Sequence, residues 1–192
     1  MAGASAAPPQ LGQATVLVID AQREYVDGAL PLAGVGPAIA EIGRLLDQAR
    51  QAGAAVIHVK HRGREGGAFD PTAPRGQIVA ELAPAGAEIV VEKSLPNAFA
   101  GTDLKARLDA TGRKDLVVVG FMTHMCVEAT TRAALDLGFK PTVIATATAT
   151  RDLPDPVAGG TISAAEVQRN ALAALNDRFA LVLPDVAALG NK

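Results

Sequence analysis

Residues 115–138, DLVVVGFMTHMCVEATTRAALDLG, contain the junction that decides the fold. The run Asp115–Gly120 is apolar on both faces and rich in valine, as expected of a strand buried inside a parallel sheet. A helix is predicted over Met125–Leu137, and Gly138 supplies its stop. A buried strand that feeds directly into a helix is the repeating unit of α/β folds.

The same alternation continues on both sides of this junction. Further short apolar runs occur at Thr15–Asp20, Ala54–Val59, Glu88–Glu92, Thr142–Thr146 and Ala180–Leu183. Helical periodicity occupies Pro37–Ala52, Thr102–Ala110 and Ser163–Asn176, the last opening with the capping-box pair Ser163 and Glu166. We therefore predict one doubly wound α/β domain, with a six-stranded, mostly parallel sheet and helices on both faces in a Rossmann-like three-layer α/β/α arrangement.

Composition limits the classes of function. The chain has 192 residues, of which 49% are hydrophobic and 20% charged, with a formal net charge of -2. This balance excludes intrinsic disorder and gives no general attraction to nucleic acid or to anionic membranes, so we expect a small-molecule partner. Residues 1–14 are predicted to be a mobile tail without signal-peptide character, and 15–192 the folded domain. Because one cysteine cannot form an internal disulfide, we expect a cytoplasmic protein.

Three chemically useful side chains follow predicted strands. Asp20 ends the first, Lys93 follows the third, and Cys126 lies in the first turn of the helix after the fourth. Each alone has an ordinary explanation: a turn former, a solvated charge and a buried small residue, respectively. In a doubly wound sheet, however, the carboxyl ends of the strands share one edge. There a helix N-terminus and a lysine would favour a thiolate, and an aspartate could move its proton.

The sequences around these residues resemble one family. VIDAQREY around Asp20, VEKSLPNAF around Lys93 and GFMTHMCVEATTRAALDLGF around Cys126 resemble the signature blocks of the isochorismatase-like cysteine hydrolases, which include nicotinamidases and N-carbamoylsarcosine amidohydrolases. The resemblance implies an Asp20–Lys93–Cys126 catalytic triad. It also implies a non-proline cis peptide at Phe121–Met122, which would direct the N–H groups of Met122 and Cys126 into an oxyanion hole.

The resemblance also implies a substrate pocket and an assembly. The pocket residues would be Gln22, Tyr25, Phe99, Phe121 and His124, although His124 could instead cap the helix. Subunits of the family commonly associate, so we expect a homo-oligomer, either a dimer or a tetramer.

Two departures from the family pattern are visible. His58 and His61 lack the neighbouring carboxylate of metal-dependent nicotinamidases, so we expect neither a metal nor another cofactor. Thr146 stands where the family usually has an aspartate after the fifth strand.

The leading hypothesis is a cysteine hydrolase that cleaves a C–N bond of a small amide or ureido compound through a thioester. Two alternatives stay open: an isochorismatase-type vinyl-ether hydrolase, and a catalytically idle binding or assembly module on the same fold. A phospho-acceptor receiver domain fits less well, because it needs a paired acid where this chain has Asp20 and Ala21.

Overall fold

A computed structural model describes residues 7–190, and its centre is the predicted six-stranded sheet. The strands follow the order β3-β2-β1-β4-β5-β8, and every neighbouring pair is parallel. Their bounds are β1 Thr15–Ile19, β2 Ala55–His61, β3 Ile89–Lys93, β4 Asp115–Phe121, β5 Lys140–Ala149 and β8 Leu181–Leu183. The predicted doubly wound α/β class is confirmed. Because β1 and β4 are neighbours, the order reverses between them, where such sheets bind ligands.

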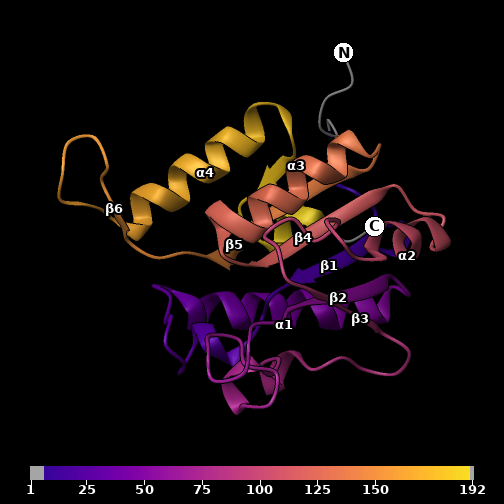
Figure 1. Ribbon diagram of the computed structural model, residues 1–192. Helices are drawn as coiled ribbons and strands as arrows, with labels where there is room; N and C mark the ends of the chain where they lie inside the picture. The colour runs from indigo at the N-terminus through magenta and orange to yellow at the C-terminus, as the bar shows by residue number, and fades with distance from the viewer. Residues whose placement is uncertain (1–6, 191–192) are drawn as a thin grey trace.

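Helices cover both faces of the sheet (Figure 1). Helix α1, Val35–Gln51, packs on one face, and α2, α3 and α4 pack on the other, with bounds Leu104–Ala110, Glu128–Asp136 and Ala164–Arg178. Short 3₁₀ turns occupy Leu11–Gln13, Arg23–Tyr25, Pro74–Gly76, Ala80–Leu82 and Val186–Leu189, and a π-helical turn occupies Thr123–Val127. The predicted capping box of α4 is present, since the side chains of Ser163 and Glu166 accept hydrogen bonds from each other's backbone N–H.

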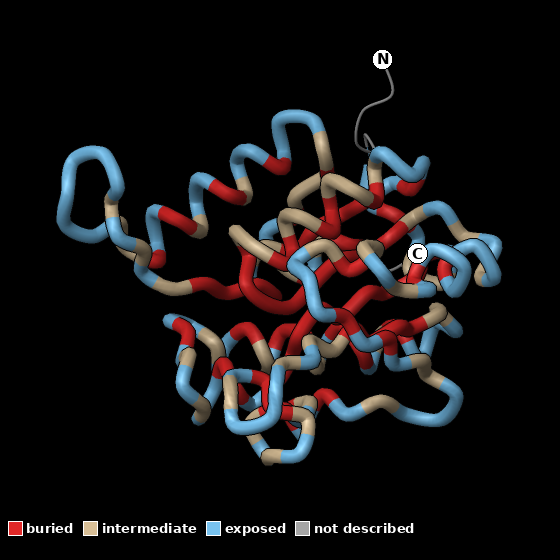
Figure 2. The backbone as a smooth tube through the Cα atoms, in the orientation of Figure 1, coloured by how far each residue is buried: buried red, intermediate tan, exposed pale blue. Residues whose placement is uncertain are grey.

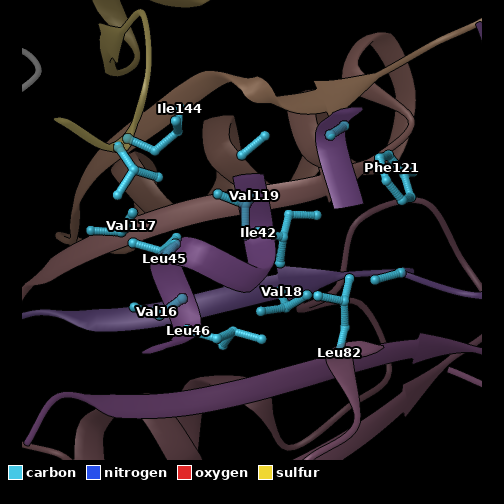
Figure 3. Close-up of a cluster of buried hydrophobic side chains, with 14 of the residues drawn as sticks. Val16, Val18, Ile42, Leu45, Leu46, Leu82, Val117, Val119, Phe121 and Ile144 are labelled. Carbon is cyan, nitrogen blue, oxygen red and sulfur yellow. The ribbon is translucent and has the colours of Figure 1, made fainter. Parts of the chain in front are cut away.

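The core is aliphatic, as the scarcity of aromatic residues predicts. Figure 3 shows Val16, Val18, Val117 and Val119 of β1 and β4 facing Ile42 and other apolar side chains of α1. Gly120 is needed where these two strands meet, because an added Cβ would lie 2.0 Å from the carbonyl oxygen of Ile19. The backbone φ of +113° at Gly120 also disfavours any other residue. This close approach holds the ends of β1 and β4 together.

The structure differs from the sequence prediction in two outlying parts. Of the predicted tail, Leu11–Gln13 form a 3₁₀ turn and Ala14 is fully buried in the core, so the fold begins before Thr15; residues 1–6 lie outside the described part. Strands β6, Leu153–Pro154, and β7, Thr161–Ile162, form an unpredicted antiparallel hairpin. This hairpin projects from the body before α4 and is largely exposed (Figures 1 and 2).

Between residues 7 and 190, no helix combines the length and the hydropathy that crossing a bilayer would require.

Candidate active site

Asp20 lies directly after β1, at the point where the strand order reverses. Its backbone takes a left-handed φ of +49°, which aspartate tolerates better than most residues, and its N–H donates to the carbonyl of Val59 at 2.9 Å. The side chain is fully buried. Burial raises the pKa of Asp20 even though the Lys93 ammonium opposes the rise. The carboxylate is therefore a stronger base than an exposed one.

Lys93 ends β3 and joins the predicted residues into one cluster. Its Nζ lies 2.7 Å from Oδ2 of Asp20 and 3.3 Å from Sγ of Cys126, so the three predicted triad residues do meet. Only 2% of Lys93 is exposed. A third partner, Nδ1 of His61, lies 3.0 Å from the same ammonium. A buried cation here neutralises Asp20 and can stabilise a thiolate on Cys126.

Cys126 lies in the π-helical turn Thr123–Val127, which joins β4 to α3. The peptide bond Phe121–Met122 just before this turn is cis, as the family resemblance implies. The thiol is buried, with 3% of the residue exposed. Burial, followed by the negative charge of Asp20, raises the pKa of Cys126 to about 12. The resting site therefore holds a thiol, contrary to the expected thiolate, because desolvation outweighs the Lys93 ammonium.

Gln22 was expected to line the pocket, but it holds backbone instead. Its amide oxygen accepts from the N–H of His61 at 2.8 Å, and its amide nitrogen donates to the carbonyls of His61 and Gly76 at 2.9 and 2.8 Å. The side chain is fully buried. Gln22 thus ties the end of β2 to the loop that follows it.

Tyr25 and Phe121 pack beside the cluster. Their rings meet edge to face at a centroid distance of 5.9 Å, and Tyr25 makes a similar contact with Phe69 at 5.1 Å. Both predicted pocket residues are buried. Burial, followed by the negative charges of Asp20 and Cys126, raises the pKa of Tyr25, so the phenol stays protonated. Tyr25 therefore lies near Asp20 and Cys126 and belongs to an aromatic group that also includes Phe69 and Phe121.

The other predicted pocket residues, Phe99 and His124, contact residues outside the cluster of Asp20, Lys93 and Cys126. Phe99 is half-buried and stacks on Phe139. Nδ1 of His124 lies 2.6 Å from the hydroxyl of Thr150. Thr150 and Thr146 also line a cavity of 780 Å³ between the starts of α1 and α4 and the end of β5. None of Asp20, Lys93 and Cys126 lines this cavity, so its size says nothing about the substrate of the cluster.

The remaining histidines, His58 and His61, each have a charged side chain as a partner. Nε2 of His58 meets Glu88 at 3.0 Å, whereas His61 faces Lys93. Among residues 7–190, no three His, Cys, Asp or Glu side chains are grouped as metal ligands.

The sequence prediction missed a role for His61, which lies two residues beyond the predicted strand Ala54–Val59. Strand β2 extends through His61, and His61 is the direct partner of Lys93 in the parallel pairing of β2 and β3. Aligning the ends of the second and third apolar runs, Val59 and Glu92, would have placed Lys60 opposite Lys93, one residue away from the pairing that the structure shows.

Known proteins resemble this chain in sequence and in fold. A model of the isochorismatase domain matches residues 14–184. A solved isochorismatase from Pseudomonas putida is 45% identical and covers 94% of this chain and 92% of its own, with a TM-score of 0.90. The secreted isochorismatase effector Isc1 of Verticillium dahliae is 34% identical over 85% of this chain and 84% of its own length.

Several curated relatives are named as hydrolases. A streptothricin hydrolase from Streptomyces noursei is 37% identical over 91% of this chain and 63% of its own length. The ureidoacrylate amidohydrolase RutB of Stutzerimonas stutzeri and the maleamate amidohydrolase of Pseudomonas putida are each 30% identical, over 71% and 67% of this chain. Fold, domain match and relatives agree with the three sequence blocks, and the chain belongs to the isochorismatase family of hydrolases.

Proposed function

We propose that this hydrolase cleaves a C–N bond of a small amide or ureido compound through a thioester on Cys126. The observation that supports this most strongly is the buried cluster in which the Lys93 ammonium lies 2.7 Å from Asp20 and 3.3 Å from Cys126. A nucleophile, a base and a cation within contact distance are the groups that covalent acyl transfer needs.

The first step is proton transfer within the cluster. The resting thiol is neutral because burial, followed by the Asp20 charge, raises the pKa of Cys126 to about 12. Asp20, whose pKa is also raised by burial, accepts the thiol proton as the thiolate attacks the substrate carbonyl carbon. Lys93 stabilises the negative charge as it moves from the carboxylate to sulfur and then to the carbonyl oxygen.

The tetrahedral intermediate then collapses. We assign the N–H groups of Met122 and Cys126 to the oxyanion, because the π-helical turn Thr123–Val127, which begins directly after Met122, contains the thiol. The C–N bond breaks as Asp20 gives its proton to the leaving nitrogen, and the thioester remains on Cys126. Water adds to the thioester while Asp20 accepts the water proton. When the C–S bond breaks, that proton returns to sulfur and the acid leaves.

The substrate class rests on the relatives. Two of them are named for substrates with a carboxamide or ureido group, ureidoacrylate and maleamate. The C–N bond of a carboxamide and that of a ureido group can both be cleaved in the same way: a nucleophile adds to the carbonyl carbon, and the tetrahedral intermediate collapses.

The test is ammonia release from a panel of small primary amides, carboxyamides and ureido acids, including ureidoacrylate and maleamate. We expect turnover by the native chain, and a loss of at least about 10³-fold in Cys126→Ala and Cys126→Ser, with melting temperatures close to native. Mass spectrometry of rapidly quenched enzyme should show an acyl adduct on Cys126. Because the chain has a single cysteine, no other thiol can carry it.

Each competing function predicts a different result. Amide turnover retained in Cys126→Ala would contradict the thioester, whereas turnover of a vinyl ether and of no amide by the native chain would favour the vinyl-ether alternative. Failure of the native chain on the whole amide panel, together with failure on a vinyl ether, would favour an idle binding module.

A further inference from the structure

We propose that His61 is a positioning residue for the proposed reaction, because its Nδ1 accepts a hydrogen bond from Lys93 and thereby fixes the N–H that points at Cys126. This inference rests on the proposed function of the cluster. It assigns a role to a side chain that the sequence places outside the triad.

The hydrogen-bonding capacity of the ammonium is the first argument. A lysine ammonium has three N–H donors and no acceptor. Around Nζ of Lys93 lie Oδ2 of Asp20 at 2.7 Å, Nδ1 of His61 at 3.0 Å and Sγ of Cys126 at 3.3 Å. Each donor therefore has one partner. Because Lys93 is buried, losing the His61 acceptor would leave a charged N–H unpaired, and the ammonium would turn to recover a partner.

The second argument is that His61 is itself held firmly. Strand pairing places it directly opposite Lys93, so both side chains leave their strands at the same level. The Gln22 amide binds the N–H and the carbonyl of His61 at 2.8 and 2.9 Å. The ring packs against Phe69 with a centroid distance of 4.9 Å. A side chain fixed at both backbone and ring can position another group accurately.

The protonation state agrees with this role. Burial, followed by the Lys93 charge, lowers the pKa of His61 to about 4. The ring is therefore neutral at neutral pH. Because Nδ1 accepts from Lys93, the ring proton lies on Nε2.

The test compares His61→Asn with His61→Leu. These side chains have the same number and branching of heavy atoms, but only asparagine can place an oxygen where Nδ1 lies. Iodoacetamide alkylation at pH 8 reports on Cys126 without any substrate. We expect alkylation of His61→Leu to be about tenfold slower than that of His61→Asn, because a displaced ammonium stabilises the thiolate less. With a panel substrate, His61→Leu should lower kcat about 10- to 100-fold and leave KM nearly unchanged, and His61→Asn should recover most of kcat.

The matched control is His58→Leu. His58 lies on the same strand but is paired with Glu88, so its loss should lower the melting temperature without changing alkylation or kcat. Equal alkylation and equal kcat in His61→Asn and His61→Leu would overturn the positioning role. If His61→Leu does not fold, His61→Gln takes its place in the comparison. The glutamine side-chain oxygen lies one bond farther from the backbone than Nδ1 does, so it does not occupy the position of Nδ1.

The two proposals fail separately. Turnover retained in Cys126→Ala would overturn the proposed function, whereas an inactive Cys126→Ala with identical His61 variants would overturn only the inference about His61.

Discussion

Replacing Lys93 with methionine should make the stability of the protein depend on the ionisation of one buried carboxyl group. The Asp20–Lys93 pair, with its atoms 2.7 Å apart, is worth about 6 kcal/mol of Coulomb energy at an effective dielectric constant of ~20, before the cost of desolvation. Without the cation, the fully buried Asp20 escapes an unpaired charge by taking up a proton. The folded-state pKa of Asp20 then lies far above the unfolded value of 3.8. The free energy of unfolding of the variant therefore falls as the pH rises above that value.

The magnitude follows from the proton uptake. Keeping Asp20 protonated costs about 1.4 kcal/mol for each pH unit above the unfolded pKa of 3.8, which gives about 1.6 kcal/mol at pH 5 and about 4.4 kcal/mol at pH 7. The reference is Lys93→Met combined with Asp20→Asn, which has no carboxyl group to protonate.

The assay is urea unfolding of both variants at pH 5, 6 and 7. The difference in unfolding free energy between the single and double variants should widen by about 1.4 kcal/mol per pH unit. A difference that does not change with pH would refute the assignment of Asp20 and Lys93 as a buried, charged pair.

Four further outcomes are expected. Gly120→Ala should lower the free energy of unfolding by more than ~3 kcal/mol, because the alanine Cβ would lie 2.0 Å from the backbone oxygen of Ile19. A melting temperature equal to that of the native protein would contradict this expectation. Gln22→Leu removes the three hydrogen bonds of a buried side chain and should lower the free energy of unfolding by about 3 kcal/mol. Hydrogen exchange in residues 62–79 should become faster, and unchanged exchange there would contradict the anchoring role of Gln22. Burial alone would raise the pKa of Glu88, but hydrogen bonds from Arg50, the Ala85 amide and His58 lower it to about 2. The contribution of Glu88 to the free energy of unfolding is therefore full above pH 4.5 and disappears as the pH falls through about 2. Glu88→Gln should therefore cost ~1–2 kcal/mol at pH 6, after allowance for partial exposure, and progressively less toward pH 3 in denaturant titrations. Burial raises the pKa of Cys126 to about 12, so the rate of alkylation of the native protein should increase about tenfold per pH unit from pH 7 to 10. A rate that stops increasing below pH 9 would contradict the raised pKa.

The sequence predicts the framework well for a physical reason. Strands buried on both faces are continuous apolar runs, and helices are amphipathic, so β1 and α1 are readable from local pattern alone. Asp20, Lys93 and Cys126 follow such runs directly, and parallel pairing brings strand ends together. The meeting of these three residues at one edge of a parallel sheet could thus be expected from the sequence, whereas the order of the strands is seen only in the structure.

The rest depends on non-local contacts. His61 and Gln22 show no local sign of their roles, because these roles arise from the register of β2 on β3 and from backbone carbonyls far along the chain. The raised pKa of Cys126 depends on how completely the finished structure excludes water, which a helix N-terminus in the sequence does not reveal.

The distribution of Asp20, Lys93 and Cys126 over separate strands also determines when, during folding, the proposed active site forms. Asp20, Lys93 and Cys126 belong to segments that meet only after β4 has paired with β1 and β3 has been joined to β1 through β2. Contacts between such distant segments form late in folding. A refolding chain should therefore regain its helices and strands before its activity. Until then its single thiol is exposed to oxidants with ordinary thiol reactivity, and completion of the sheet both assembles the active centre and shields it.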